Sequence, residues 1–172
     1  SAGRFGSILR ENVDATIRVD ADDRGVVVHG DRSEFKLPAS DPAEFPPIVE
    51  FEETAFVEVP ARLVRELIRR TLFATDNESS RNALGGVLLE FDADRITAVA
   101  TDGRRLAKME GPASATESFS RSADDITIVP SRAMQLIERS ISDADAEIQI
   151  AARANDILVR SQRATVYARL LE

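Results

Sequence analysis

The spacing of apolar residues predicts three amphipathic helices. Within residues 3–12, 60–75 and 131–141, apolar side chains recur every three or four positions, which places them on one face of a helix. Pro60 stands at the start of the second segment, where its fixed φ and missing N–H suit the first helical turn. Each of these segments therefore has one face suited to covering a hydrophobic core.

Period-two alternation and short apolar runs predict strands between the helices. Residues 38–47 are rich in Pro and acidic residues and are interpreted as a linker, whereas the small polar residues 112–125 predict a surface loop. The pair Asp102-Gly103 marks an expected turn of a strand meander. Together with the helices this pattern favours an α+β fold, with strands expected within residues 15–39, 55–59, 82–111, 126–130 and 146–172.

The two ends of the chain resemble each other. Ile8 recurs as Leu136 at an offset of 128, and the apolar run at 26–28 recurs at 157–159 at an offset of 131. The match predicts that a unit of one helix followed by strands recurs after the length of a domain. Chance similarity is the alternative, because few of the paired residues are identical.

The charge is acidic overall but basic on the predicted helices. The formal net charge is −8 at pH 7, which by itself does not indicate a nucleic-acid binder. Arg62, Arg65 and Arg69 nevertheless share one face of the second predicted helix, and Arg132 and Arg139 repeat the spacing in the third. Two interpretations stay open: a surface that holds phosphates without reading sequence, or solvated faces with local ion pairs.

The amino-acid composition excludes several kinds of catalytic site. The chain has no Cys, which excludes disulfides, thiol nucleophiles and thiolate ligands and fits a reducing compartment. His29 is the single histidine, and no G-x-x-x-x-G-K-[ST] phosphate loop occurs. Asp92, Asp94 and Asp102 are candidates for a metal-binding cluster, although Asp is common in turns for conformational reasons. No apolar run reaches the roughly 20 residues of a membrane helix.

Three motifs then occur in order along the chain: "RNALGGVLLEF" at 81–91, "ITAVATDGRRLA" at 96–107 and "IVPSRAMQLIE" at 128–138. Together they resemble the middle domain of the bacterial DNA polymerase III beta subunit, the sliding clamp. That family has a Leu-x-Gly ahead of a strand, a Thr-Asp-Gly-x-Arg-Leu-Ala hairpin and a Val-Pro that opens a helix. The stretch "FKLPASDPAEFP" at 35–46 is similar to the family's passage out of its first domain.

The resemblance implies a DNA-clamp fold, an α+β fold of repeated domains in which two helices pack on antiparallel sheets. Residues 1–52 then correspond to the C-terminal part of the first domain plus a linker, and residues 53–172 to a nearly complete middle domain. The third domain of the family is absent from the sequence, and the first residue is not Met. We therefore expect the chain to be a piece of a longer protein.

The same resemblance implies a non-catalytic processivity factor of DNA replication with no cofactor and no metal. Full-length members of the family form a homodimer ring that encircles double-stranded DNA and slides on it. The ring tethers the replicative polymerase, the clamp loader and other proteins that carry a short clamp-binding motif of the Gln-x-x-Leu-Phe kind. A cytoplasmic location without membrane association is expected on the same ground.

Carried over to this sequence, the family's hydrophobic cleft for partner peptides is expected at Leu84, Thr101, Gly103, Arg104, Arg105 and Leu106. Arg104 stands where the family usually has His, which adds a fixed charge to the rim of the cleft. The DNA-binding residues that the resemblance implies are Arg81 and Arg132. Helix geometry adds Arg62, Arg65 and Arg69 to this set.

Two rival functions predict different structures. A metal-dependent enzyme requires the side chains of Asp92, Asp94 and Asp102 to converge on one site. A protein-interaction module without a DNA role predicts that the arginines of the 60–75 helix are paired with nearby acids rather than open.

Overall fold

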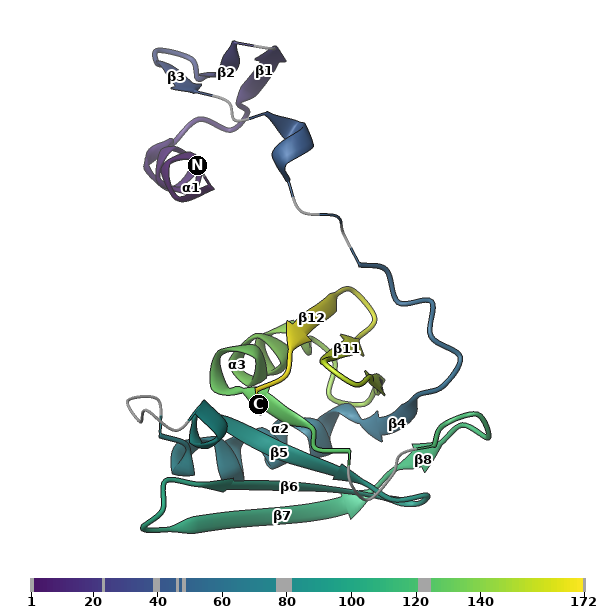
Figure 1. Ribbon diagram of the computed structural model, residues 1–172. Coiled ribbons are helices and arrows are strands. Elements are labelled where there is room, and N and C mark those ends of the chain that lie inside the picture. Colours follow the sequence, from purple (N-terminus) through teal and green to yellow (C-terminus); the bar gives the residue numbers. More distant parts are fainter. Residues whose placement is uncertain are drawn as a thin grey trace. The chain divides into compact units, whose positions relative to one another are not determined.

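The chain divides into two compact units, Ser1–Ile48 and Val49–Glu172 (Figure 1). The computed structural model describes residues 2–22, 24–38, 41–45, 47, 49–76, 82–120 and 125–171. The division lies close to the boundary expected from the sequence. Phe51 belongs to the second unit because it packs against Ala151 and Leu158 there.

The first unit is a helix with a small antiparallel sheet. The helix and the sheet are joined by a short irregular segment, and the sheet has the strand order β1-β2-β3. A short 3-10 helix, η1, follows the sheet. The elements are α1 (Ala2–Glu11), β1 (Arg18–Asp22), β2 (Gly25–His29), β3 (Glu34–Pro38) and η1 (Pro42–Glu44).

The second unit contains two antiparallel sheets. The order is β12-β11-β10-β4-β8 in the first and β7-β6-β5-β9 in the second. The first consists of β4 (Val57–Pro60), β8 (Ser114–Ala115), β10 (Glu147–Ala152), β11 (Asp156–Arg160) and β12 (Thr165–Arg169). The second consists of β5 (Gly86–Phe91), β6 (Arg95–Thr101), β7 (Leu106–Pro112) and β9 (Ile128–Pro130).

Two helices begin directly after a strand that ends in proline. α2 (Ala61–Thr71) follows Pro60, and α3 (Ser131–Ser140) follows Pro130. The predicted 60–75 helix ends early, at Thr71, whose hydroxyl donates to the carbonyl of Leu67 at 2.6 Å. The chain then tightens into the 3-10 helix η2 (Leu72–Ala74). A second 3-10 helix, η3 (Asn82–Gly85), precedes β5.

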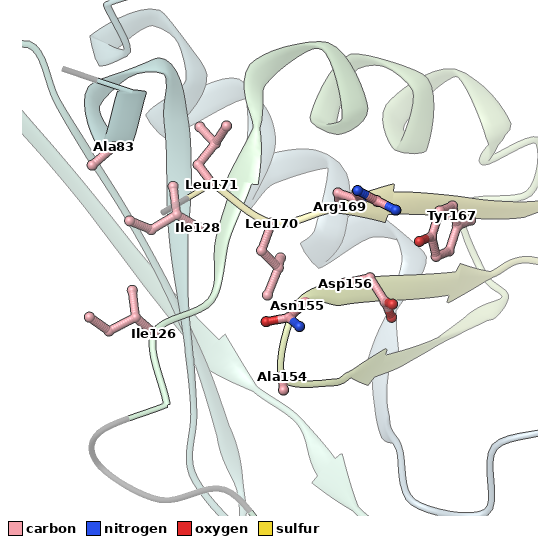
Figure 2. A pocket seen from close by; sticks show the side chains of 10 residues that line it. All are labelled: Ala83, Ile126, Ile128, Ala154, Asn155, Asp156, Tyr167, Arg169, Leu170 and Leu171. Atoms are coloured by element: carbon pink, nitrogen blue, oxygen red, sulfur yellow. The ribbon is translucent and has the colours of Figure 1, made fainter. Parts of the chain in front are cut away.

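The second unit is built from two similar halves that exchange a strand. The first half runs β4-α2-β5-β6-β7 and the second runs β9-α3-β10-β11-β12. β4 pairs with β10 of the second half, and β9 pairs with β5 of the first half. Leu171 forms one further bridge with Ile128, so the end of the chain lies beside β9 (Figure 2). Each sheet therefore contains strands from both halves.

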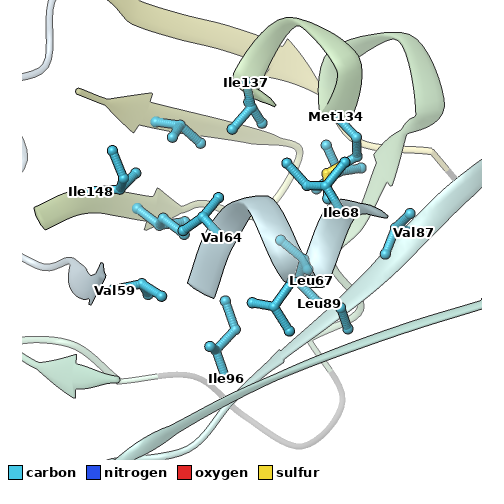
Figure 3. Packing of buried hydrophobic residues seen from close by; sticks show 14 of the residues in the cluster. Val59, Val64, Leu67, Ile68, Val87, Leu89, Ile96, Met134, Ile137 and Ile148 are labelled. Carbon is cyan, nitrogen blue, oxygen red and sulfur yellow. The ribbon is translucent and has the colours of Figure 1, made fainter. Parts of the chain in front are cut away.

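The core of this unit lies around the two helices (Figure 3). Leu67 and Ile68 of α2 and Ile137 of α3 are almost completely buried, together with Val87 and Ile148 of the two sheets. Burial of each such side chain contributes roughly 1.5–3 kcal/mol. The predicted apolar faces of residues 60–75 and 131–141 are the faces that form this core.

The repeat predicted from the sequence is present in the structure. A helix followed by three antiparallel strands occurs as α1-β1-β2-β3 and again as α3-β10-β11-β12. β2 and β11 are related by the predicted offset of 131, and so are β3 and β12. The strand β8 corrects the prediction of a loop over residues 112–125, because its residues Ser114 and Ala115 pair with β4.

No helix in the described part of the chain is long and apolar enough to cross a membrane.

Candidate functional site: the 101–106 hairpin and the arginine-bearing helices

The turn between β6 and β7 is organised by Asp102. Its Oδ1 accepts the backbone N–H groups of Arg104 and Arg105, both at 3.0 Å. Gly103 has φ of +84°, a left-handed conformation that glycine adopts without steric cost. The Asp-Gly pair is therefore required by the backbone of the turn, which explains its place in the motif.

Thr101 closes the same turn from the other side. Its Oγ1 accepts the N–H of Gly103 at 3.0 Å and donates to the carbonyl of Arg105 at 2.7 Å. The hydroxyl is therefore satisfied inside the hairpin. Thr101 also pairs across the strands with Leu106, the first residue of β7.

Arg105 is held in place by two contacts of its guanidinium group. Nε donates to Oδ2 of Asp102 at 2.9 Å, and the group lies over the ring of Phe73 at 5.7 Å from its centroid. The backbone N–H bonds from Arg104 and then from Arg105 lower the pKa of Asp102 below its ordinary 3.8. Burial acts in the opposite direction, and the Arg105 side chain adds to the lowering.

The expected apolar residues lie at one end of the second sheet. Leu106 is 65% exposed although it is a large aliphatic residue, and Leu84 in η3 is half-buried. The carbonyl of Leu84 accepts the N–H of Asp76 at 2.8 Å. Asp76 in turn lines a hollow of about 430 Å³ together with Thr75 and three hairpin residues: Asp102, Arg104 and Arg105.

Phe73 is a candidate residue of this site that the sequence pattern did not identify. It lies in η2, after α2 has ended; the residue is 59% exposed and its ring lies beneath the guanidinium group of Arg105. Helical periodicity placed it inside the 60–75 helix. The signal available in the sequence was only that Phe73 falls off the apolar face of Leu67 and Ile68.

The three α2 arginines that were expected to bind DNA have partners within the chain. Arg62 pairs with Asp145 at 2.8 Å and Arg69 pairs with Glu138 at 2.7 Å. Arg65 donates from Nη2 to the carbonyl of Ile141 at 2.5 Å. All three contacts join α2 to α3 or to the segment that follows it. This pairing is the one that the interaction-module alternative predicts for α2.

The arginines of α3 differ from those of α2. Arg132 and Arg139 are exposed, and neither guanidinium makes an ion pair or hydrogen bond among the described residues. Gln135 is exposed between them on the same face. Arg81, the remaining residue expected to bind DNA, lies outside the residues that the structure describes.

The three aspartates of the metal-site alternative do not converge. Asp92 and Asp94 lie in the turn before β6, and Asp102 lies in the turn after it. The seven residues of β6 separate the two turns, which is about 20 Å of extended strand. Within the described ranges no group of three metal-ligating side chains occurs. The metal-dependent enzyme is therefore not supported by this geometry.

Comparison with known proteins identifies the family. Residues 58–172 match the family model described as "DNA polymerase III beta subunit, central domain". The beta sliding clamp of Halalkalibacterium halodurans is 24% identical over 169 residues, which is 98% of this chain and 44% of that protein. The beta sliding clamp of Chlamydia pneumoniae is 29% identical over 170 residues, 98% of this chain and 45% of that protein. The chain thus spans less than half the length of these relatives.

Solved structures agree with the sequence comparison. The DNA polymerase III subunit beta of Pseudomonas aeruginosa has a TM-score of 0.84 and 26% identity, covering 99% of this chain and 46% of that one. The Helicobacter pylori beta clamp, solved bound to a DNA ligase peptide, has a TM-score of 0.84 and 22% identity, covering 99% and 47%. The expected α+β DNA-clamp fold is confirmed. The chain belongs to the DNA polymerase III beta subunit family, the sliding clamps, and matches its central domain over residues 58–172.

Proposed function

We propose that this chain is part of a replication sliding clamp, a non-catalytic ring subunit that encircles double-stranded DNA and tethers other proteins to it. In the full-length protein two subunits close the ring, and it acts in the cytoplasm without a cofactor. Residues 1–52 supply the end of the first domain with a linker, and residues 53–172 the middle domain. Family membership and the match to clamps over 99% of the chain support this proposal.

The hairpin provides one wall of a cleft for partner peptides. The observation that carries this is the combination of an exposed Leu106 with a rigid, internally hydrogen-bonded turn at Thr101 and Asp102. A preorganised apolar surface loses little entropy when it binds. A clamp of the same fold has been solved with a DNA ligase peptide. The partners are the replicative polymerase, the clamp loader and other proteins that carry such motifs.

The experiment is a titration of isotope-labelled chain with a Gln-x-x-Leu-Phe peptide. We expect amide shifts at Leu84, Thr101, Gly103 and Leu106. Leu106→Ala should weaken binding about tenfold, because it removes most of one aliphatic contact. Leu136→Ala is the matched control, since Leu136 is 54% exposed on α3, away from the hairpin.

Either of two results contradicts the peptide-binding proposal. Shifts that cluster outside the hairpin assign the site elsewhere. Equal weakening by Leu106→Ala and Leu136→Ala means that apolar exposure in general, rather than the hairpin, is responsible.

A second candidate is a protein-interaction module that does not bind DNA. The pairing of Arg62 and Arg69 with acids of the α3 segment favours it. The open guanidinium groups of Arg132 and Arg139 favour the clamp instead. We propose that phosphate contacts are made by Arg132 and by Arg139, which lies two turns further along the same face of α3. Arg62, Arg65 and Arg69 then act mainly by holding α2 and α3 together, and Arg81 is retained as a DNA-binding residue on the resemblance alone.

A further inference from the structure

Residues 49–56, which we call the strap, cover part of the face of the first sheet that is turned away from the helices. Ile150 of β10 and Ile157 of β11 belong to the main core around the helices. Their neighbours along the strands, Ala151 and Leu158, therefore point to the opposite face. Such a face of an antiparallel sheet is ordinarily solvated. Ala151 and Leu158 are nevertheless only 1% and 0% exposed, because the strap packs on them.

The strap forms a small apolar cluster with this patch of the sheet. Phe51 is the strap residue buried in the cluster, and its ring meets that of Phe56 edge-on, with 5.9 Å between the centroids. Val49 is partly buried against the same cluster. Among the described residues, the cluster has no member in common with the main core. A satellite cluster with so few buried apolar contacts opens at a lower free-energy cost than the core.

Side chains of the second unit hold the backbone of the strap. Arg160 of β11 donates from Nη1 to the carbonyl of Phe51 at 3.2 Å, and its guanidinium group lies over the Phe51 ring at 4.3 Å from the centroid. The carbonyl of Thr54 accepts the hydroxyl groups of Thr116 and Ser118 at 3.2 and 2.8 Å. Because these bonds are donated by side chains, breaking them leaves the hydrogen bonds between the strands of the sheet intact.

The seat of the strap is organised by the sheet itself. Arg160 donates from Nε to Oε1 of Gln149 on β10 at 2.8 Å, and Nε2 of Gln149 donates to Oε1 of Glu58 on β4 at 2.8 Å. Gln149 lies directly opposite both of these residues in the strand register. At the edge of the seat, Arg153 pairs with Glu53 of the strap at 3.2 Å. The row of three polar side chains that positions Arg160 therefore contains no residue of the strap.

We propose that the strap detaches from this seat as a local unit while both sheets and both helices stay folded. Detachment uncovers the apolar patch at Ala151 and Leu158 and separates Phe51 from Arg160. Because the strap joins the two units of the chain, its detachment also adds residues 49–56, roughly 27 Å of fully extended backbone, to the connection between them. The inference goes beyond the proposed function, since it requires neither DNA nor a peptide.

Thiol labelling with iodoacetamide tests the proposal, because the chain has no cysteine. Ala151→Cys places a single thiol beneath the strap, and Ala98→Cys is the matched control, since Ala98 is 0% exposed in the main core. Each rate is divided by that of the same variant unfolded in concentrated urea. In dilute buffer we expect Ala151→Cys to react at least about a hundredfold faster than Ala98→Cys, with a rate that depends only weakly on added urea.

A second reporter guards against displacement of the strap by the added sulfur atom. Leu158→Cys removes volume beneath the strap rather than adding it, and it should also react much faster than Ala98→Cys. Fast labelling of Ala151→Cys together with slow labelling of Leu158→Cys means that the first substitution itself dislodged the strap. That result overturns the proposal.

Two further substitutions identify the contacts that hold the strap. Added to Ala151→Cys, Phe51→Ala should raise the labelling rate about tenfold or more, because it removes the buried ring. Arg160→Met should raise it about threefold, because it removes the cation above that ring. Phe45→Ala is the matched control, since Phe45 is 73% exposed and precedes the strap. It should leave the rate unchanged.

Two outcomes contradict local detachment. Equal labelling of Ala151→Cys and Ala98→Cys with the same steep urea dependence means that the seat opens only when the whole unit unfolds. Equal rates after Phe51→Ala and Phe45→Ala mean that the strap does not control access to the seat. Neither outcome touches the proposed function, because no reporter lies in the hairpin or on the exposed face of α3.

Discussion

Both carboxylate oxygens of Asp102 accept hydrogen bonds from within the hairpin. Oδ1 accepts two backbone N–H groups and Oδ2 accepts the guanidinium of Arg105. All of these donors favour the charged carboxylate, which is why the pKa of Asp102 is lowered. The stability of the turn that precedes Leu106 therefore depends on the ionisation of a single residue, Asp102.

Acid should loosen this turn only at low pH. The pKa of folded Asp102 is lowered, so its carboxylate stabilises the hairpin above the ordinary value of 3.8, and the stabilisation is lost as pH falls through the lowered pKa. In an NMR titration from about pH 6 to about pH 2, the amide signals of Arg104 and Arg105 should move together with a midpoint below 3.8. Asp102→Asn should abolish this shared transition, and a midpoint above 3.8 contradicts the account.

At the residue scale, the sequence predicted the hairpin well because its contacts are local. Thr101, Asp102 and Gly103 form hydrogen bonds with residues no more than four positions away. A short sequence motif contains all the residues that such local contacts need. The exposure of Phe73 was not predictable from periodicity, since it depends on α2 ending at Thr71. Whether the six expected cleft residues bind a peptide stays a prediction.

Arg62, Arg65 and Arg69 each connect α2 to α3 or to the segment after it. Of these three side chains, Arg65 is the least exposed. Arg65 is half-buried, and the carbonyl of Ile141 that it binds directly follows α3. A cation at the C-terminal end of a helix also interacts favourably with the helix dipole. Arg65 therefore joins α2 to α3 and caps α3.

Arg65→Met should lower the free energy of unfolding by about 2 kcal/mol, because it leaves a carbonyl without its charged donor. Arg70→Met is the control, since Arg70 is exposed on the same helix and makes no ion pair with described residues. Its effect should stay within about 0.5 kcal/mol. Urea denaturation of both variants measures the difference. Equal effects of the two substitutions are incompatible with a capping role.

The exposed arginines of α3 give a separate prediction for DNA. Labelled chain mixed with a short duplex at low salt should show amide shifts around Arg132 and Arg139, and added salt should remove them. The double variant Arg132→Glu, Arg139→Glu should lose the shifts, whereas Arg163→Glu, in the exposed turn between β11 and β12, should keep them. Absence of salt-sensitive shifts in the unaltered chain favours the interaction module without a DNA role.

At the element scale, the helices were predictable from the sequence because apolar residues recur every three or four positions in each of them. The sequence did not predict the partners of the basic face, since Arg62 and Asp145 are 83 positions apart and Arg69 and Glu138 are 69 apart. It also missed β8, a two-residue strand too short to carry a period. Long-range pairing is set by the packing of the whole unit rather than by local pattern.

For the molecule as a whole, the exchange of β4 and β9 makes the two halves of the second unit depend on each other. Neither sheet is complete without a strand from the other half. The buried residues of α2 and α3 also belong to one shared cluster. A half of this unit therefore lacks both a complete sheet and a closed core.

A chain cut between β8 and β9 should test this dependence. We expect the pieces 49–118 and 119–172 to be unfolded when separate and to regain the β-sheet signal in circular dichroism when mixed. A piece that folds cooperatively alone contradicts the account. The uncut chain treated in the same way is the control.

The exchanged strand also has a consequence for the order of events at the ribosome. Glu58 of β4 contacts Gln149 of β10, which is made 91 residues later. At ordinary elongation rates, on the order of ten seconds pass between the synthesis of β4 and that of β10. During that interval Val57 and Val59, which are fully buried in the finished unit, have no sheet partner on that side. The nascent chain is therefore most open to chaperone binding, or to pairing with the wrong strand, at the segment that begins this unit.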